Sequence, residues 1–359
     1  MQFGHGTQDD PTSSASHDGR SMVVDAKHEY EIVHHEGVVK VRCLDPKRCK
    51  EKGAMCKNTK LRRYPCRQVS KSILRRCYHT MTRLHQMLQS VVSILEGTNQ
   101  SLPNCRIPLT LGDPNGVAND IACVAKLHNE DPCFLVPNPS FGNLRRWDGR
   151  EAYVTEKNLP WMDKRDAAFY RGSCREDYDM YRLQPRLDLM SIDDDRLDVS
   201  WMRTSGVYKC LQLVTRTPLQ LQHHVGIVRA KAREEEFTQY KVLLNLPGSR
   251  GGIYSRHLAK LWNKGSIVVL WENTAKEWYF DQLVEGKNVI VVNKTTVLSK
   301  VNRLLELSVD EQKNLAMGAQ DVFGSSLTGR KMAERWQEAF HSLCLQDVEI
   351  NVQADRCAT

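Results

Sequence analysis

The sequence predicts an α/β protein whose C-terminal half is a doubly wound sheet of parallel strands. Short apolar runs at residues 240–246, 266–271 and 288–292 are typical of buried strands. Segments with apolar residues at helical spacing separate these runs. A Gly-rich turn at residues 247–252 follows the first run, so this part of the chain has the strand, turn, helix, strand order of a βαβ unit.

The Gly-rich turn reads Pro-Gly-Ser-Arg-Gly-Gly and is followed by Arg256 at the expected start of a helix. Glycine lets the backbone bend sharply and approach a ligand closely. Glycine amides, a helix N-terminus and the guanidinium groups of Arg250 and Arg256 would suit a phosphate. A simple strand-to-helix connection with two solvated arginines explains the same residues, and the turn alone does not decide between the two.

Length and composition fit a globular protein of two domains. The chain has 359 residues, of which 41% are hydrophobic and 26% charged. No apolar run has the length of a membrane span. We expect residues 1–39 to be disordered, residues 40–160 to form a basic, Cys-rich domain, residues 161–345 to form the C-terminal α/β domain, and residues 346–359 to form a tail.

The net charge of +8 is concentrated near the N-terminus. Residues 40–83 contain 15 Lys and Arg but only Asp45 and Glu51, a local excess of +13. Such a block can bind nucleic acid or another anionic polymer. A solvated basic face is the commoner explanation, so nucleic acid is not the favoured partner.

Four of the 12 cysteines lie in this block, at positions 43, 49, 56 and 66. The gaps of five, six and nine residues do not fit the close C-x2-4-C pairs of zinc sites. A disulfide-stapled patch fits better and implies an oxidising compartment. The N-terminal residues show neither the basic start nor the apolar core of a signal peptide, which leaves the compartment open.

The N-terminal half begins with a long helix and a strand. Residues 70–96 carry one continuous apolar stripe that ends at Gly97, and residues 105–111 form an apolar run that we expect to be a strand. Pro108 favours an edge position for that strand. Asp113 follows in the turn Gly-Asp-Pro, at a strand end where α/β folds bind ligands. Asp-Pro is also a common turn former, and position alone favours that explanation.

The C-terminal half continues with elements outside the βαβ unit. A strand at residues 167–173, a charged helix at 175–190, and helices at 296–307, 309–323 and 328–343 fit the pattern. A capping-box sequence marks the start of the helix at 309–323. Residues 148–160 look like a linker, and 193–195 like a surface turn. His223 and His224 have no partner at metal-ligand spacing and are expected on the surface.

Several short motifs occur in a fixed order. Phe-Tyr-Arg-Gly-Ser ends at Ser173, Pro-Arg-Leu-Asp-Leu starts at residue 185, and Tyr-Lys starts at 240 before the Gly-rich turn. Gly-Ser-Ile-Val-Val starts at 265 and Glu-Trp-Tyr-Phe at 277, before the strand at 288–292. In this order and spacing the chain resembles family-90 glycosyltransferases, the capsule-associated and lipopolysaccharide-modifying (CAP domain-like) type that includes Rumi-type protein O-glucosyltransferases. The resemblance is strong over residues 164–343.

The resemblance implies a GT-B fold, in which two Rossmann-like domains face a cleft and the C-terminal domain binds the nucleotide sugar. It implies that Asp113 is the catalytic base that deprotonates the acceptor hydroxyl in an inverting transfer. It places Arg256 as the principal cation of the phosphate-holding turn. The residues matched to nucleotide-sugar binding are Arg171, Gly172, Ser173, Arg186, Gly248, Ser249, Arg250, Gly251, Gly252, Tyr254, Ser255 and Arg256.

The resemblance also implies the reaction and its partners. The donor would be a UDP-sugar carrying glucose or xylose, and the acceptor a hydroxyl of a glycan or of Ser/Thr on a disulfide-rich protein. No metal or other cofactor is expected, and the lumen of the endoplasmic reticulum or Golgi is the implied location. The alternative is a non-catalytic, transferase-like scaffold whose basic block at residues 40–83 binds an anionic polymer or a protein partner.

Overall fold

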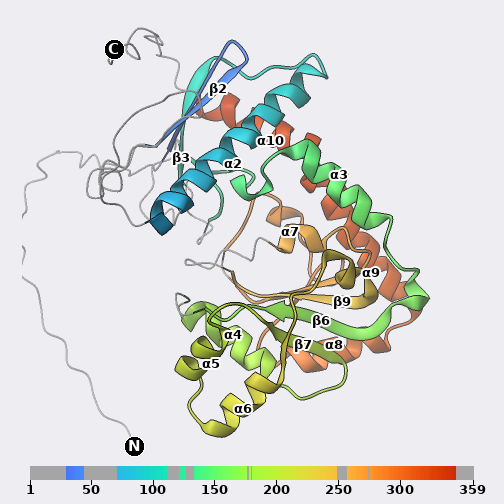
Figure 1. The fold of residues 1–359 in the computed structure, drawn as a ribbon. Coiled ribbons are helices and arrows are strands. Elements are labelled where there is room, and N and C mark those ends of the chain that lie inside the picture. The colour runs from blue at the N-terminus through green and yellow to red at the C-terminus, as the bar shows by residue number, and fades with distance from the viewer. Residues whose placement is uncertain are drawn as a thin grey trace, which may run out of the picture.

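The computed structural model describes residues 30–43, 71–110, 121–126, 133–175, 178, 180–248, 257–273 and 275–344. Over these residues the chain forms two β-sheets with helices packed on them, one sheet above the other in Figure 1. The α/β fold class predicted from the sequence is therefore confirmed. Within the described residues no helix is long and apolar enough to cross a membrane.

The first sheet is mixed and has the strand order β2-β1-β3-β4-β5. The strands β1 and β2 form an antiparallel hairpin, and β1 also pairs antiparallel with β3. The strands β3, β4 and β5 are parallel to one another. Its strands are β1 (Tyr30–His35), β2 (Val38–Cys43), β3 (Cys105–Thr110), β4 (Ala122–Cys123) and β5 (Phe134–Leu135). Because β3 has a neighbour on each side, the edge position predicted from Pro108 is wrong.

Helices from both ends of the chain cover the first sheet. The helix α2 (Lys71–Glu96) packs against β2, and the last described helix, α10 (Gly329–Leu343), packs against β3 and against α2. Both helices confirm the sequence prediction. The helix α3 (Leu144–Thr155) lies where a linker was predicted; its N-cap, Asn143, accepts a hydrogen bond from the amide of Arg146.

The second sheet has six strands, and every adjacent pair is parallel. Its order, β11-β10-β9-β6-β7-β8, is the 3-2-1-4-5-6 order of the Rossmann fold when the strands are counted from the first in sequence. Its strands are β6 (Arg165–Gly172), β7 (Leu197–Met202), β8 (Val228–Arg229), β9 (Tyr240–Asn245), β10 (Ile267–Trp271) and β11 (Ile290–Val292).

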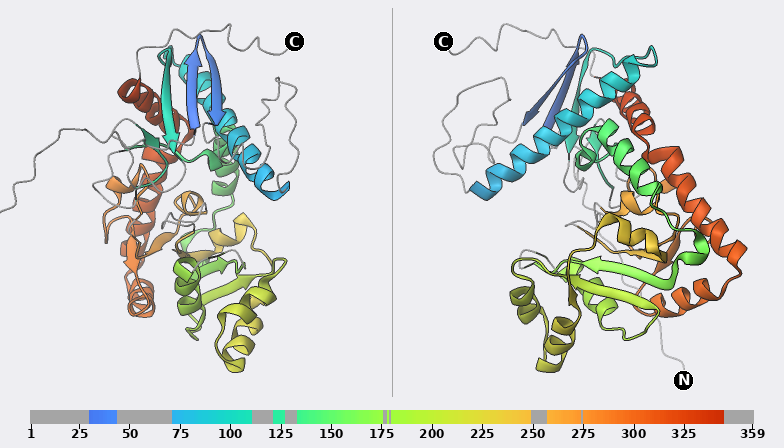
Figure 2. Two further views of the ribbon diagram at one scale, coloured as in Figure 1. Left: turned by 90° about the vertical axis from the view of Figure 1, so that its left-hand side faces the viewer. Right: turned by 45° about the vertical axis from the view of Figure 1, so that its right-hand side comes forward.

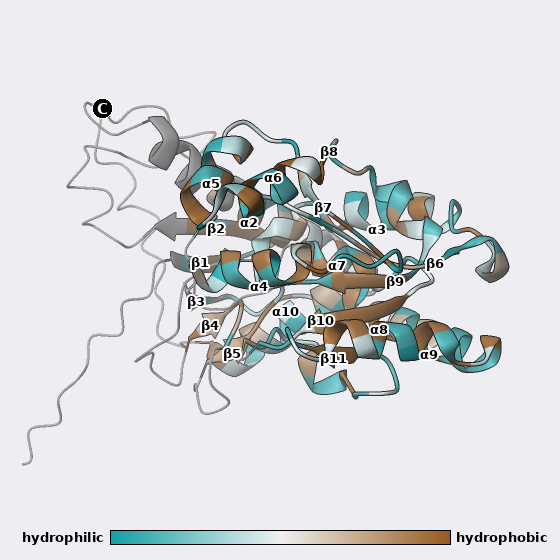
Figure 3. Ribbon diagram, turned by 90° about the horizontal axis from the view of Figure 1, so that it is seen from below, coloured by the Kyte–Doolittle hydropathy of each residue, from teal (hydrophilic) through white to brown (hydrophobic). Residues whose placement is uncertain are grey.

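Both faces of the second sheet are buried, as a doubly wound sheet requires. Along β9 and β10 the side chains alternate: Leu243 and Val268 contact one hydrophobic cluster, and Val242 and Val269 contact the other. Figure 3 shows these apolar strands beside helices striped with hydrophobic and hydrophilic residues. The helices are α4 (Met180–Met190), α5 (Val207–Val214), α6 (Pro218–Gly226), α7 (Leu258–Leu261), α8 (Val297–Glu306) and α9 (Val309–Val322).

The start of α9 matches the sequence prediction, and short helical turns complete the described chain. The predicted capping box at the start of α9 is present, because Ser308 and Glu311 exchange hydrogen bonds between side chain and backbone amide. Residues 234–239 form a 3₁₀ helix. The turns are η1 (Pro139–Phe141), η2 (Trp161–Asp163), η3 (Glu234–Gln239), η5 (Phe280–Gln282) and the π-helical η6 (Phe323–Leu327).

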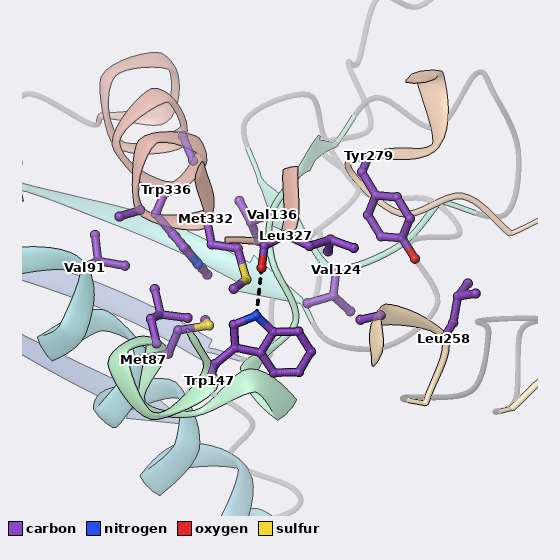
Figure 4. Packing of buried hydrophobic residues seen from close by; sticks show 14 of the residues in the cluster. Met87, Val91, Val124, Val136, Trp147, Leu258, Tyr279, Leu327, Met332 and Trp336 are labelled. Carbon is purple, nitrogen blue, oxygen red and sulfur yellow. Dashed lines mark hydrogen bonds between the residues drawn. The ribbon is translucent and has the colours of Figure 1, made fainter. Parts of the chain in front are cut away.

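One hydrophobic core joins the two sheets. Its buried members include Ile107 of β3, Trp147 of α3, Leu243 of β9 and Trp336 of α10. Figure 4 shows Trp147 inside this core, where its indole N–H donates a hydrogen bond of 2.7 Å to the carbonyl of Leu327. Each fully buried aliphatic side chain contributes roughly 1.5–3 kcal/mol, so the shared core holds the two sheets together.

Two further parts of the fold differ from the sequence prediction. Residues 30–39 were expected to be disordered, but they belong to the β1–β2 hairpin, where Ile32 and Val39 are buried. Glu36 and Gly37 both have positive φ and form its two-residue turn. The strand β7 was not predicted, and its residues 197–201 pair with β6. The rest of the expected disordered segment and the tail lie outside the described residues.

Candidate functional site

The strand order reverses between β6 and β9, which are neighbours in the second sheet. Helices leave the carboxyl ends of these two strands towards opposite sides, and in open α/β sheets ligands bind in the crevice outside that point. The strand β6 ends at Gly172, and β9 ends at Asn245. The turns that follow are the two turns singled out in the sequence, at residues 171–173 and 247–256.

Gly172 ends β6 at a position that excludes a larger residue. A Cβ atom there would lie 2.7 Å from Cε1 of Tyr170. The next residue, Ser173, shares a hydrogen bond of 2.8 Å between its Oγ and the hydroxyl of Tyr178. A disulfide between Cys174 and Cys210 then ties this turn to α5. The carboxyl end of β6 is therefore fixed on both sides by side-chain packing and a covalent bond.

Arg186 of α4 connects the two turns. Its side chain is only 4% exposed, and its Nη1 donates a hydrogen bond of 2.8 Å to the carbonyl of Pro247, next to Gly248. The same nitrogen also donates to the carbonyl of Arg182, and the Nε atom has no hydrogen-bond acceptor among the described residues. Among the described residues, the partners of this buried cation are thus backbone carbonyls and the hydroxyl group of Tyr170, which bind it without cancelling its charge.

Three guanidinium groups surround the ring of Tyr178. The Cζ atom of Arg182 lies 4.0 Å from the ring centroid, and those of Arg175 and Arg186 each lie 5.8 Å from it. Burial raises the pKa of Tyr170 beside them, and the charge of Arg186 opposes that rise. The carboxyl end of β6 thus carries a concentration of positive charge, which suits an anion with several oxygens.

The structure separates the described candidates into two groups. Gly172, Ser173, Arg186 and Gly248 lie together at the carboxyl ends of β6 and β9. Arg171 does not join them, because its guanidinium forms an ion pair of 2.7 Å with Asp198 of β7 and is 10% exposed. Strand alternation explains this difference: Arg171 is still within β6, and its side chain lies on the face of the sheet beside Phe169.

The other candidates lie outside the described residues, namely Asp113, Ser249, Arg250, Gly251, Gly252, Tyr254, Ser255 and Arg256. Their flanking residues are placed. Thr110 ends β3, which Figure 2 (left) shows running down towards the second sheet, so the turn with Asp113 starts on that side. Gly248 and His257 bracket the Gly-rich turn, and the buried α7 follows it.

Glu277 is a residue that the site predictions omitted. It is 8% exposed and lies beyond the carboxyl end of β10. The preceding residue, Lys276, forms a β-bridge with Lys126, which follows β4 of the first sheet. Burial raises the pKa of Glu277 to about 8, so the carboxyl group is mainly protonated at neutral pH. A neutral carboxyl group can donate a hydrogen bond as well as accept one. The sequence drew attention to this residue only as part of the Glu-Trp-Tyr-Phe motif.

Of the histidine pair, His223 is exposed as predicted, but His224 is not on the surface. His224 is 3% exposed, and its Nδ1 accepts a hydrogen bond of 3.3 Å from the indole of Trp201. Burial and the neighbouring His223 lower the pKa of His224 to about 4. Among the described residues no group of three or more His, Cys, Asp or Glu side chains is arranged to hold a metal ion.

The described residues contain two disulfides that were not predicted from the sequence. Cys123 bonds to Cys133 in the first sheet, and Cys174 bonds to Cys210 beside the candidate site. The predicted patch of four cysteines in the basic block involves side chains outside the described set. Two formed disulfides indicate an oxidising environment independently of that patch.

Comparison with known proteins gives weak similarities. No protein-family model and no curated protein matches the chain. The crystal structure of TarM is similar with a TM-score of 0.35 and 10% identity, covering 52% of this chain and 37% of TarM. The GtfA/B complex gives 0.36 and 11%, covering 51% and 37%. A mutant of S. aureus TarM in complex with fondaparinux, alpha-GlcNAc-glycerol and UDP gives 0.32 and 11%, covering 49% and 36%.

The matched region thus spans little more than a third of each of these proteins, at 37%, 37% and 36%. Likeness at this level assigns no function to the chain. The functional argument rests on the geometry of the second sheet and on the motifs in the sequence.

Proposed function

We propose that this protein is a glycosyltransferase that uses a nucleotide-diphosphate sugar as donor. The observation that carries the proposal is the placement of buried Arg186 at the switch point of a Rossmann-ordered sheet, bonded to backbone carbonyls and to the start of the Gly-rich turn. A diphosphate fits this place, since a buried cation to which no carboxylate of the described residues is bound favours an anionic ligand. The ordered motifs around it resemble family 90.

The two turns have complementary roles in the proposed site. The first turn contributes Gly172 and Ser173, and its position is set by the Tyr178 hydroxyl. The second turn starts at Gly248 and supplies the backbone amides of residues 249–252 and the guanidinium groups of Arg250 and Arg256. Together with Arg186 these groups bind and neutralise the leaving diphosphate, and no metal is required for that role.

Asp113 is the proposed general base. The acceptor hydroxyl oxygen forms a bond with the anomeric carbon of the sugar while the bond from that carbon to the phosphate oxygen breaks. The hydroxyl proton goes to the carboxylate of Asp113, and the bonding electrons leave with the nucleotide diphosphate. Attack from the side opposite the leaving group inverts the anomeric centre.

A screen for UDP release tests the proposed function. The purified full chain is incubated with UDP-glucose, UDP-xylose and other UDP-sugars, and free UDP is measured with and without candidate acceptors. We expect UDP-glucose or UDP-xylose to give the highest release, and acceptors with Ser/Thr or glycan hydroxyls to increase it. The absence of both UDP binding and UDP release for every donor would overturn the proposal.

Replacing Asp113 tests the role of the base. We expect Asp113→Asn to lower sugar transfer by roughly 10²–10⁴-fold, the usual contribution of a general base, because the amide cannot accept the proton. UDP affinity should stay close to that of the wild type. Asp321→Asn, at an exposed position of α9, is the control and should leave both quantities unchanged. Unaltered turnover of Asp113→Asn would exclude Asp113 as the base.

The second candidate function is that of a transferase-like scaffold. It is favoured by the excess of 13 positive charges at residues 40–83, which would attract an anionic polymer. Binding through such a block weakens steeply as salt concentration rises. Salt-sensitive binding of a polyanion by a protein that does not bind UDP would select this function over transfer.

The proposed compartment follows from the disulfides. Two bonded pairs, Cys123–Cys133 and Cys174–Cys210, are typical of proteins that fold in an oxidising environment. We therefore propose the lumen of the endoplasmic reticulum or Golgi, where a disulfide-rich protein or a glycan would be available as acceptor. Localisation of the full-length gene product by immunofluorescence tests this placement.

A further inference from the structure

Two cysteines that are not bonded lie against each other between the first sheet and the last described helix. Cys105 is the first residue of β3, and Cys344 is the residue that follows α10. The side chains of the two are in hydrogen-bond contact. The Sγ atom of Cys105 also lies 3.8 Å from the carbonyl oxygen of Phe340, in the last turn of α10. Strand and helix are therefore packed together at this point.

The two thiols differ in their exposure. Cys105 is 1% exposed and belongs to the core shared by the two sheets. Cys344 is half-buried and packs against the same core from its rim. One thiol is thus sheltered and the other can be reached by a reagent in solution.

We propose that Cys105 and Cys344 form a disulfide that fastens the last helix to the first sheet. Cys105 contacts the last turn of α10, directly before Cys344, and the described residues already contain two bonded pairs that require the same oxidising environment. This inference does not depend on the proposed function, because it concerns the shared core and not the nucleotide site.

The bond forms by two exchange reactions with a disulfide oxidant such as oxidised glutathione. The thiolate of Cys344 attacks one sulfur of glutathione disulfide, which gives a mixed disulfide and releases one glutathione. The thiol of Cys105 then loses its proton and attacks the Cys344 sulfur, which releases the second glutathione. Two protein thiols are oxidised, and one glutathione disulfide is reduced to two thiols.

The order of attack follows from the surroundings of the two sulfurs. Burial raises the pKa of Cys105, as does its contact with Cys344, so this thiol stays protonated. The more accessible Cys344 therefore reacts first with the oxidant, and Cys105 completes the bond from inside the core.

The proposed disulfide would stabilise the folded chain. The bond would close a loop that starts at β3, contains the whole second sheet and ends at α10. Closing a long loop restricts the unfolded chain and stabilises the folded one.

Tryptic mapping tests the bond directly. Cleavage gives peptides 84–106 and 336–356, and each contains a single cysteine. The full-length protein, secreted from eukaryotic cells and alkylated before digestion, is mapped without reduction. We expect a linked species of these two peptides that disappears on reduction. Two alkylated peptides, or a link from Cys344 to any other cysteine, would overturn the inference.

Thermal unfolding of variants provides a second test. Under oxidising conditions we expect Cys344→Ser to lower Tm by about 5–10 °C, the range that follows from the usual effect of a disulfide. Cys105→Ser/Cys344→Ser should lower it little further, because either change already removes the bond. After full reduction the wild type and Cys344→Ser should melt within about 1–2 °C of each other. Equal Tm values before reduction would show that no bond stabilises the wild type.

Discussion

The two ends of the second sheet both bury positive charge, but they hold it differently. At the amino end, Lys264 is fully buried, and its Nζ lies 3.1 Å from the carboxylate of Glu151, which is itself 1% exposed. Glu151 also accepts hydrogen bonds from Arg150. At the carboxyl end, buried Arg186 donates instead to the backbone carbonyls of Arg182 and Pro247.

This difference separates structural charge from functional charge. A cation paired with a carboxylate is neutralised within the protein, and breaking such a pair is costly while an added anion gains little. A cation bound to carbonyl and hydroxyl dipoles keeps its net charge and attracts an anion. The comparison therefore assigns Glu151 and Lys264 to the stability of the fold and Arg186 to ligand binding.

The largest expected effect is at the amino end. Glu151→Gln leaves Lys264 buried without its carboxylate, and we expect a loss of roughly 3–5 kcal/mol in the free energy of unfolding. Urea denaturation followed by fluorescence measures it. UDP affinity of the folded variant should be unchanged, because the pair lies away from the carboxyl ends of the strands.

Two further variants serve as controls for Glu151→Gln. Glu306→Gln breaks an exposed ion pair with Arg196 and should cost no more than about 1 kcal/mol. Glu151→Gln/Lys264→Met removes both charges of the buried pair and should recover most of the loss. A double variant as unstable as the single one would show that the charges are not the cause.

The second expected effect is the pH dependence of stability, also at the amino end. Lys164 lies at the start of β6, is 5% exposed, and its Nζ donates to the carbonyl of Lys264 and to the hydroxyl of Ser266. Burial lowers the pKa of Lys164 to about 8 from an ordinary value of 10.5. Between these two pH values the folded state binds fewer protons than the unfolded state, so the free energy of unfolding rises with pH.

This contribution should amount to about 3 kcal/mol between pH 8 and pH 10.5, because each unit of pKa shift corresponds to about 1.4 kcal/mol. In Lys164→Met the rise should be absent, whereas Lys313→Met, at an exposed position of α9, should retain it. Urea unfolding at several pH values gives both curves. Parallel curves for the wild type and Lys164→Met would mean that Lys164 does not titrate in this range.

The parts of the fold that the sequence predicted are those with a local signal. The runs that became β9 and β10 consist mainly of apolar residues, and a capping box marks the start of α9. The β1–β2 hairpin also had a local signal that was missed, since Glu36-Gly37 separates two Val- and Ile-containing runs and suits a two-residue turn. The basic block that begins within it drew attention to charge instead of strand pattern.

The candidate site contains side-chain contacts that no local sequence signal predicts. Ser173 and Arg186 could be proposed from motifs, but the ring of Tyr178 between the guanidinium groups could not, because its neighbours come together only when α4 packs on β6. Arg171 looked equivalent to its neighbours in the motif. Because side chains alternate between the two faces along a strand, Arg171 lies on the sheet face beside Asp198. The motif does not record this direction.

The smallest effect considered is at the carboxyl end and bears most directly on function. We expect Arg186→Ala to weaken UDP binding by roughly 1.5–3 kcal/mol, which is the range for a lost hydrogen bond to a charged group. Titration calorimetry at fixed salt measures the change. Arg186→Lys should lie between the wild type and Arg186→Ala, because it keeps the charge but cannot reproduce the planar set of donors.

The UDP affinities of the variants can be compared only if all the variants are folded. Arg186 also donates a hydrogen bond to the carbonyl of Pro247, so its replacement removes a contact next to the Gly-rich turn. Near-UV circular dichroism establishes that each protein is folded before binding is measured. Arg196→Ala, which removes an exposed guanidinium paired with Glu306, is the matched control and should bind UDP like the wild type. If Arg186→Ala and Arg196→Ala bind UDP equally well, the buried charge at the carboxyl end is structural, like Lys264, and the contrast between the two ends of the sheet fails.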